Sequence, residues 1–396
     1  MSHQIPPLER IALKGLEIAP SQVWGGVRLV PLLRRDSPGD LRLSRRSYDD
    51  DMTVVALDGK RPLEQPRTVY SSYIPHALVA SWSNDGTPVA AFGCQMTRYD
   101  GKQIKAGPVT VRIAHRMARR EAPNRLRFLP LHLSMEGFLA LHFGGPDIAW
   151  EEYSHDTLAY GLGSRAESSY SGDMIAGLAD ALRVFEIHQQ QVGVLVFVAD
   201  ALASAFVVSH PEDYRALHQS LIEDFYGELM YYYGYLYPNP NRMETYIDDK
   251  KVASLADMRQ ALAKMRSDWA QFQAVMAEAI LEREVLSQNI YRLGPFQLQR
   301  FMTQLKQRSG NHIGEAIVRE DGTLEYLKTY RLSEAQRHRA YLLSQLAAHN
   351  WNIRATAEGL QQTYGEFILR MGKAGFDYLL KEHVLRAARQ YNQLPR

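Results

Sequence analysis

Residues 342–376 read LLSQLAAHNWNIRATAEGLQQTYGEFILRMGKAGF, and this stretch decides how the C-terminal part of the chain is expected to fold. Its apolar spacing predicts three short helices, at about residues 334–349, 353–360 and 364–374. Asn352 and Thr363 precede the second and third helices, where their side chains can accept hydrogen bonds from free backbone N–H groups. Gly375 follows the third helix, at a position that commonly requires a positive φ. The stretch therefore predicts a compact helical unit with a tight corner.

The order of these residues resembles a known DNA-binding domain. The residues that carry the resemblance are Asn352, Ala357, Leu360, Thr363, Phe367, Met371, Gly375 and Phe376. They resemble the Fis-type helix-turn-helix, which is also found at the end of many bacterial enhancer-binding activators, over about residues 334–387. In that family the third helix enters the major groove and the domain acts as a dimer. The resemblance implies double-stranded DNA as a partner, contacted by Arg354, Thr363, Tyr364, Glu366, Arg370 and Lys373.

The same stretch departs from the family pattern at its corner. Gln361 and Gln362 stand where the family has a glycine and an apolar residue. Glu366 places a negative charge where phosphates would be close. Residues 331–396 nevertheless hold ten Lys or Arg against five Asp or Glu, and this net charge of +5 favours DNA. A degenerate helical unit that serves packing or protein contacts is the alternative.

A second resemblance lies in the N-terminal half. Residues 126–143 read LRFLPLHLSMEGFLALHF, and residues 171–225 contain the apolar run VGVLVFV, followed by a helix that Pro211 would open. These stretches resemble the ARPP-type domains, the ARG and rhodanese-phosphatase-superfamily-associated proteins. Such domains occur in bacterial gene clusters thought to act against phages or other invaders. The resemblance covers residues 8–236 and implies an accessory or sensing domain, without catalytic residues that could be transferred.

Short apolar runs and turn signals predict strands before and after this region. Residues 27–33 form one apolar run. Asp85-Gly86 and Asp321-Gly322 each separate two further runs, and Asp-Gly is a strong signal for a β-hairpin. Between the hairpins, apolar residues alternate at three- and four-residue spacing: Leu255, Met258, Leu262, Met265, Trp269, Phe272 and Met276. Such a seam requires a partner helix, which could be residues 296–305 or the same helix in a second copy.

These patterns predict an α+β fold in three parts. An N-terminal mixed α/β domain with several β-hairpins occupies residues 1–237. A linker, long helices and a β-hairpin occupy residues 238–330, and the Fis-type helix-turn-helix occupies residues 331–396. The bulk of Trp269 and Phe272 favours packing of the seam within one chain, and a homodimer is the other option.

Composition and motifs predict a protein without a recognisable reaction centre. Cys94 is the only cysteine, which excludes a disulfide framework or a multi-cysteine zinc site within one chain. Neither HExxH nor G-x-S-x-G occurs, so we predict no catalytic residues, no cofactor and no metal. Residues 1–10 contain no apolar core of a signal peptide, and no apolar run in the sequence is long enough to span a bilayer. We therefore expect a cytoplasmic protein that does not cross a membrane.

The sequence as a whole predicts a non-catalytic DNA-binding protein, either regulatory or accessory, in a bacterial conflict system that resembles phage defence. Protein partners encoded nearby are expected. One alternative is a protein-interaction scaffold with a degenerate helix-turn-helix. Another is an enzyme whose unrecognised active site lies in the N-terminal domain.

Overall fold

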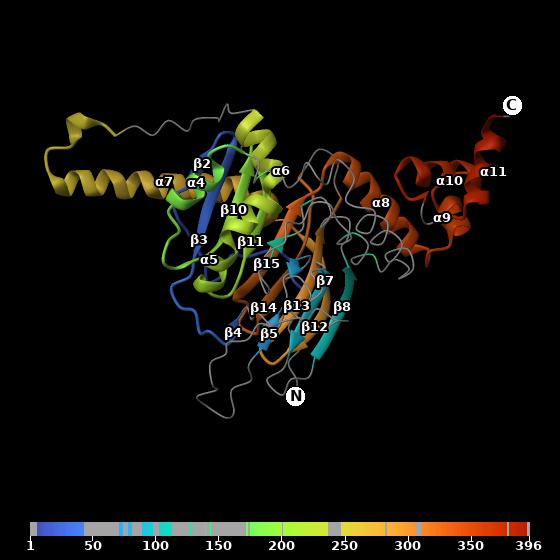
Figure 1. The fold of residues 1–396 in the computed structure, drawn as a ribbon, viewed down its shortest axis with the longest axis horizontal. Coiled ribbons are helices and arrows are strands. Elements are labelled where there is room, and N and C mark those ends of the chain that lie inside the picture. Colours follow the sequence, from blue (N-terminus) through green and yellow to red (C-terminus); the bar gives the residue numbers. More distant parts are fainter. Residues whose placement is uncertain are drawn as a thin grey trace.

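The computed structural model describes most of the chain in separate segments. They are residues 6–42, 71–73, 78–80, 89–97, 103–112, 127–128, 175–199, 201–236, 247–281, 283–305, 310–377 and 380–393, with single positions at 131, 139, 143 and 172. These residues form two β-sheets, a group of short helices on the larger sheet, a projecting helix and a C-terminal helical unit (Figure 1).

The larger sheet is built from strands in three separate parts of the sequence. Its strands are β1 (Glu17–Ile18), β2 (Gln22–Trp24), β3 (Val27–Leu33), β10 (Gln191–Val198), β11 (Ala201–Val207), β12 (Val285–Leu293), β13 (Phe296–Thr303), β14 (His312–Arg319) and β15 (Leu324–Arg331). Their order is β1-β3-β10-β11-β15-β14-β13-β12, with β2 paired to β3, and all these pairings are antiparallel. The predicted strand at residues 27–33 and the predicted hairpin around Asp321-Gly322 are confirmed.

Both faces of this sheet are covered, which explains why β10 reads as an almost continuous apolar run. One face carries an aromatic core in which Phe206 meets Tyr326 edge-on, with ring centroids 6.2 Å apart. The other face packs against the N-terminal segment through Ile11 and against the end of helix α7 (Leu255–Leu281) through Ala277. The sheet therefore forms the centre of the molecule.

The smaller sheet supplies a second layer. Its strands are β4 (Leu41–Arg42), β5 (Ser71–Tyr73), β6 (Leu78–Ala80), β7 (Val89–Thr97), β8 (Gln103–Arg112) and β9 (Arg127–Phe128). β6 and β7 pair antiparallel, as the hairpin prediction requires, although Asp85-Gly86 itself lies outside the described residues. Phe128 of β9 contacts Phe206 with ring centroids 5.3 Å apart, which ties the smaller sheet to the core of the larger one.

The helix predicted to begin at Pro211 is present but is not regular. It runs as α5 (Pro211–Ser220), π-helix η2 (Leu221–Phe225), α6 (Gly227–Leu229) and π-helix η3 (Met230–Leu236), and α4 (Leu178–Val184) precedes it in the chain. The side chain of His210 accepts a hydrogen bond from the backbone N–H of Glu212 at the start of α5. Gly25 and Gly234 bring β2 and η3 into backbone contact, because a methyl group on Gly25 would overlap the carbonyl oxygen of Gly234.

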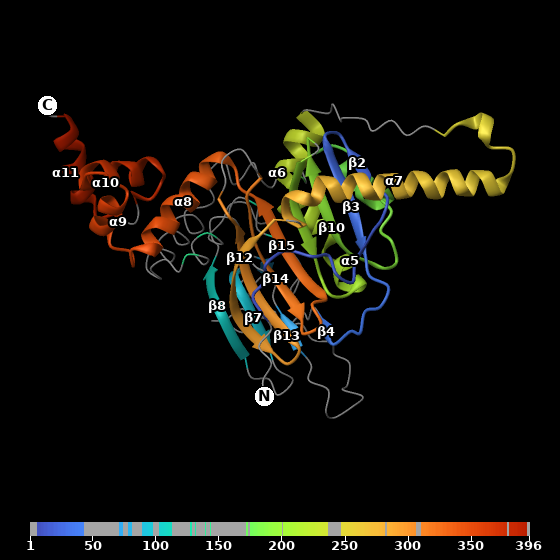
Figure 2. The same ribbon diagram turned by 180° about the vertical axis from the view of Figure 1, so that it is seen from behind.

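The middle of the chain differs from the prediction. Residues 296–305 cannot be the helical partner of the seam, because residues 296–303 form strand β13. β12–β15 join β10 and β11 in one sheet, so the predicted boundary at residue 237 falls inside a continuous structure. After the short 3-10 helix η4 (Asp249–Lys251), Ser254 caps the start of α7, where its hydroxyl accepts from the N–H of Asp257 at 3.1 Å. The first part of α7 stands clear of both sheets (Figure 2).

Two buried histidines should make the fold sensitive to acid. Burial lowers the pKa of His312 to about 3 and that of His218 to about 4. In the unfolded chain a histidine has an ordinary pKa of about 6.5. Between this value and the lower pKa of the folded state, the unfolded chain binds more protons than the folded protein. The stability that is present above about pH 6.5 is therefore lost progressively as the pH falls through this range. We expect each histidine to lower the unfolding free energy by about 2 kcal/mol between pH 7 and pH 5.

Urea titrations at the two pH values measure this effect. His312→Leu should remove its share of the pH dependence. If His312→Leu and the unmodified chain lost the same unfolding free energy between pH 7 and pH 5, His312 would not be a source of the acid sensitivity.

Candidate functional site

The C-terminal helices lie at the opposite end of the molecule from the projecting part of α7 (Figures 1 and 2). They are α8 (Glu334–Ala348), α9 (Ile353–Gly359), α10 (Tyr364–Lys373) and α11 (Glu382–Gln393). The first three begin where the sequence predicts and end one residue earlier. Phe367 and Met371 of α10 and Ala357 of α9 are buried in the same cluster as Leu343 of α8.

The predicted helix ends are confirmed. The Asn352 side chain accepts from the N–H of Ala355 at 3.1 Å, and Thr363 accepts from the N–H of Glu366 at 3.3 Å. Gly375 has a φ of +78° and ends α10. The corner between α9 and α10 also uses the left-handed region, because Gln361 has a φ of +55°. This explains why a glycine suits that position better than glutamine.

Gln361→Gly should therefore stabilise the protein. A non-glycine residue in the left-handed region costs about 1–2 kcal/mol, and the extra freedom of glycine in the unfolded chain offsets roughly half of this gain. We expect a net gain of about 0.5–1 kcal/mol in the urea unfolding free energy. Gln362→Gly is the matched control, because Gln362 is the next residue and does not have a positive φ. This substitution should not stabilise the chain.

Of the six residues predicted to contact DNA, Arg354 lies on α9, and the other five lie at the start of α10 or along it. The guanidinium of Arg354 lies 4.9 Å from the ring centre of Tyr364, and that of Arg370 lies 5.7 Å from the ring centre of Tyr341. Lys373 is exposed, and within the described part of the chain no carboxylate pairs with these three cations. Stacking on a ring holds a guanidinium in place while leaving its N–H groups available.

Glu366 has a local role that the sequence analysis did not anticipate. Its carboxylate accepts from the backbone N–H of Thr363 at 3.1 Å and from the Thr363 hydroxyl at 2.8 Å. These contacts complete a capping box. The charge of Glu366 therefore lies at the start of α10, where the helix dipole favours a negative group.

A second side of α10 is covered by α11, which the sequence analysis missed. Ile368 is fully buried with Leu385 and Ala388 in a separate cluster. Gly372 allows this contact, because a methyl group there would lie 3.2 Å from a methyl carbon of Leu385. The apolar spacing of residues 384–388 was the available signal. Two sides of α10 are therefore buried, and the side that remains accessible is a strip that carries Glu366, Arg370 and Lys373.

A cleft of about 650 Å³ lies at another place, beside the β14–β15 hairpin. It is lined by Gly15, Leu16, Glu17, Arg34, Arg35, Asp36, Pro38, Arg319, Asp321, Thr323 and Glu325. Residues from the N-terminal segment, the end of β3 and the hairpin meet there. Sequence reasoning did not find it, because Arg34 and Glu325 are 291 positions apart.

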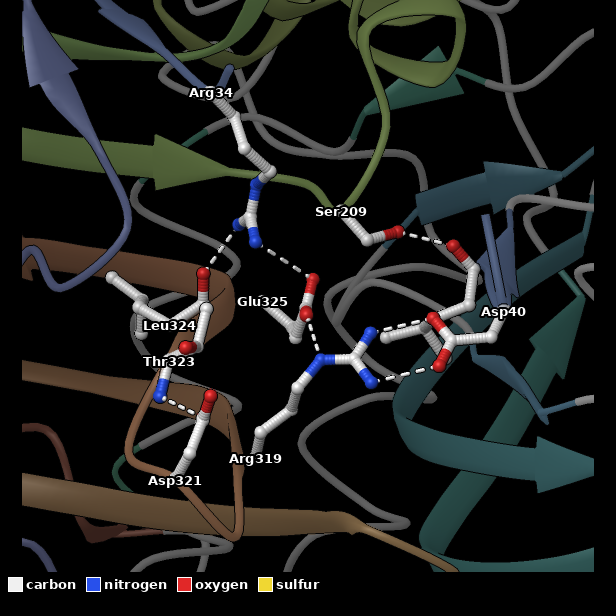
Figure 3. A network of polar contacts seen from close by, with 9 residues as sticks. Arg34, Asp40, Ser209, Arg319, Asp321, Thr323, Leu324 and Glu325 are labelled. Atoms are coloured by element: carbon white, nitrogen blue, oxygen red, sulfur yellow. Dashed lines mark hydrogen bonds and ion pairs between the residues drawn. The ribbon is translucent and has the colours of Figure 1, made fainter. Parts of the chain in front are cut away.

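Four charged residues form a network at this cleft (Figure 3). Arg34 donates to Glu325 at 3.0 Å and also to the carbonyl of Leu324. Arg319 donates to Glu325 and, through its two terminal nitrogens, to the carboxylate of Asp40 at 2.7 and 2.5 Å. Arg34 and Glu325 are both almost fully buried. Two guanidiniums thus alternate with two carboxylates, and the positive and negative charges balance.

The pKa shifts follow from this arrangement. Burial alone would lower the pKa of Arg319, but the hydrogen bonds and charges of Asp40 and Glu325 raise it on balance. Burial raises the pKa of Glu325, and the charges of Arg34 and Arg319 oppose that rise. At the rim, Arg35 pairs with Glu17 at 2.7 Å.

Metal-binding clusters and membrane-spanning helices can be sought only in the part of the chain that the structure describes. No group of three or more metal-binding side chains occurs among the residues that the structure describes. The histidine-rich stretch at residues 132–156, which could be taken for a metal site, lies almost wholly outside those residues. Of the helices described, none has the length and apolar character needed to span a bilayer.

The fold and these sites define an α+β protein with an appended helical unit. The chain belongs to the ARPP-2 family, whose model matches residues 11–294, and this confirms the ARPP-type resemblance. The match ends at the turn between β12 and β13, although β13–β15 continue the same sheet. Searches among curated proteins and among solved structures found no match.

Proposed function

We propose that this protein binds double-stranded DNA through α8–α11 and acts as a regulatory or accessory component of a bacterial conflict system. The observation that supports the proposal is the set of cations on α9 and α10, Arg354, Arg370 and Lys373, which have no carboxylate partners among the described residues. Cations of this kind, next to a capped helix start, suit contacts to phosphate groups. The resemblance of residues 334–387 to the Fis-type helix-turn-helix is the second support.

The capping box removes one objection to this proposal. Because Thr363 holds the Glu366 carboxylate, its charge is partly compensated at the start of α10 and does not extend along the strip toward Arg370. The ARPP-2 domain would supply the sensing or accessory role that the family resemblance implies.

Salt-dependent binding of a random-sequence duplex by the full chain tests the proposal. We expect Arg370→Gln and Lys373→Gln each to weaken binding and to reduce the slope of log affinity against log salt by about 1. Lys264→Gln on α7 removes the same charge from a distant exposed position and should leave the slope unchanged. No binding at low salt, or equal losses in all three variants, would refute DNA binding.

A protein-interaction scaffold is the second candidate, and the packing of α11 favours it. α11 covers the side of α10 that carries Ile368, so the accessible strip of α10 is narrow. In this case the full chain should fail to bind the duplex, while deletion of residues 331–396 should release a co-purifying protein encoded by a neighbouring gene.

A further inference from the structure

The first half of α7 exposes apolar side chains. Leu255 is 78% exposed and Met258 is 38% exposed, although both belong to the apolar seam of this helix. Leu262 and Met265 continue the seam and are only partly buried. This part of the helix stands clear of both sheets (Figures 1 and 2). Apolar side chains at such spacing, on a helix away from the body, form a surface for another helix.

We propose that the partner of this seam is α7 of a second copy, aligned antiparallel about a two-fold axis. The seam positions from Leu255 to Phe272 are separated by 3, 4, 3, 4 and 3 residues, a spacing that reads the same in both directions. An axis between Ala263 and Lys264 therefore sets every seam residue against another. The facing pairs are Leu255 with Phe272, Met258 with Trp269 and Leu262 with Met265. One self-complementary surface is what a two-fold dimer needs.

The seam also continues onto the body of the protein. The guanidinium of Arg28 on β3 lies 5.0 Å from the ring centre of Trp269. Val23 on β2 pairs directly with Arg28, so both side chains point to the face on which α7 lies, and Val23 is 45% exposed. The antiparallel alignment brings the exposed Leu255 and Met258 of the second copy to this corner. A parallel alignment would set Leu255 against Leu255 and leave Val23 uncovered.

The area available is sufficient for a specific but reversible dimer. The six seam side chains would bury about 400–500 Å² per copy, because only Leu255 and Met258 are exposed by more than about a third. With Val23 and the side chains that flank the seam, the total approaches about 1,200 Å², the lower end for specific interfaces. Arg259 and Arg266 each follow a seam methionine and therefore lie on one side of the seam, where the two copies would bring them together. Salt should strengthen this dimer by screening their repulsion, whereas salt weakens DNA binding.

Sedimentation velocity of the full chain tests the association. We expect a concentration-dependent dimer for the unmodified protein and a monomer for Leu262→Asp/Met265→Asp. Gln260→Asp/Ser267→Asp makes the same change of charge on exposed positions off the seam and should remain dimeric. Circular dichroism shows whether each variant is folded. A monomeric unmodified protein at its highest soluble concentration, or a dimer that the seam variant leaves intact, would overturn the proposal.

Spin labels then test the direction of the two helices. In a Cys94→Ser background, Ala256→Cys and Lys264→Cys each place one label per copy on α7. At a rise of about 1.5 Å per residue, an antiparallel pair separates the labels at 256 by about 20 Å more along the axis than those at 264. Equal label distances at the two positions would indicate a parallel pair and overturn the antiparallel geometry. Neither measurement involves DNA, so the dimer can be tested independently of the proposed function.

Discussion

Glu325→Gln should lower the unfolding free energy by about 3–5 kcal/mol, because it removes a buried carboxylate that two arginines share. Glu325 accepts from Arg34 and from Arg319, and the side chains of Arg34 and Glu325 are 3% and 1% exposed. A glutamine keeps the size of the side chain but carries no charge. The Arg34 guanidinium would then remain buried without this carboxylate, whereas Arg319 would keep its two hydrogen bonds to Asp40.

The matched control lies at the rim of the same cleft. Glu17→Gln is the same substitution in an ion pair whose side chains are 51% and 74% exposed. We expect this variant to lose less than about 1 kcal/mol. Arg34→Met combined with Glu325→Gln should lose less than the sum of the single variants, because the double variant no longer buries that cation. A loss in Glu325→Gln as small as that in Glu17→Gln would show that the network is not a stabilising element.

The ends of α8, α9 and α10 were predictable because local rules determine them. Asn352 and Thr363 cap their helices through atoms three residues away, and Gly375 adopts the positive φ that a helix end requires. The run at residues 192–198 was equally clear, because a strand covered on both faces is apolar throughout. In each case the residues that decide the structure are close together in the sequence.

The rest depended on contacts that the sequence does not display. Residues 296–305 were interpreted as a helical partner, yet Phe296, Leu298 and Met302 alternate with Gln297 and Gln299 in the way that suits a strand. β15 pairs with β11, and Arg34 meets Glu325, across separations of more than one hundred residues. No local pattern marks these pairings, so the charge network and the cleft appear only in three dimensions.

Gly25→Ala should lower the unfolding free energy by about 2–5 kcal/mol, from two separate causes. The first is the backbone, because Gly25 has a φ of +55°. A side chain in this left-handed region costs about 1–2 kcal/mol. The second is overlap of the added methyl group with the carbonyl oxygen and Cα of Gly234. Such overpacking costs about 1–3 kcal/mol.

The overlap at Gly25 involves backbone atoms, so a change of rotamer cannot relieve it. We expect η3 to separate from β2 in Gly25→Ala. Hydrogen exchange should then be faster at the N–H of Gly26, which donates to the carbonyl of Tyr233.

Two other glycines separate these causes. Gly294 has a φ of +56°, but nothing lies within 4 Å of the position of an added methyl group, so Gly294→Ala measures the backbone strain alone. Gly365 in α10 has neither a positive φ nor a close neighbour. Gly365→Ala should therefore stabilise the protein by about 1 kcal/mol. The difference between Gly25→Ala and Gly294→Ala in urea unfolding then gives the cost of the overlap. Equal losses in these two variants would mean that β2 and η3 can move apart freely, and that the contact does not fix the position of the π-helix.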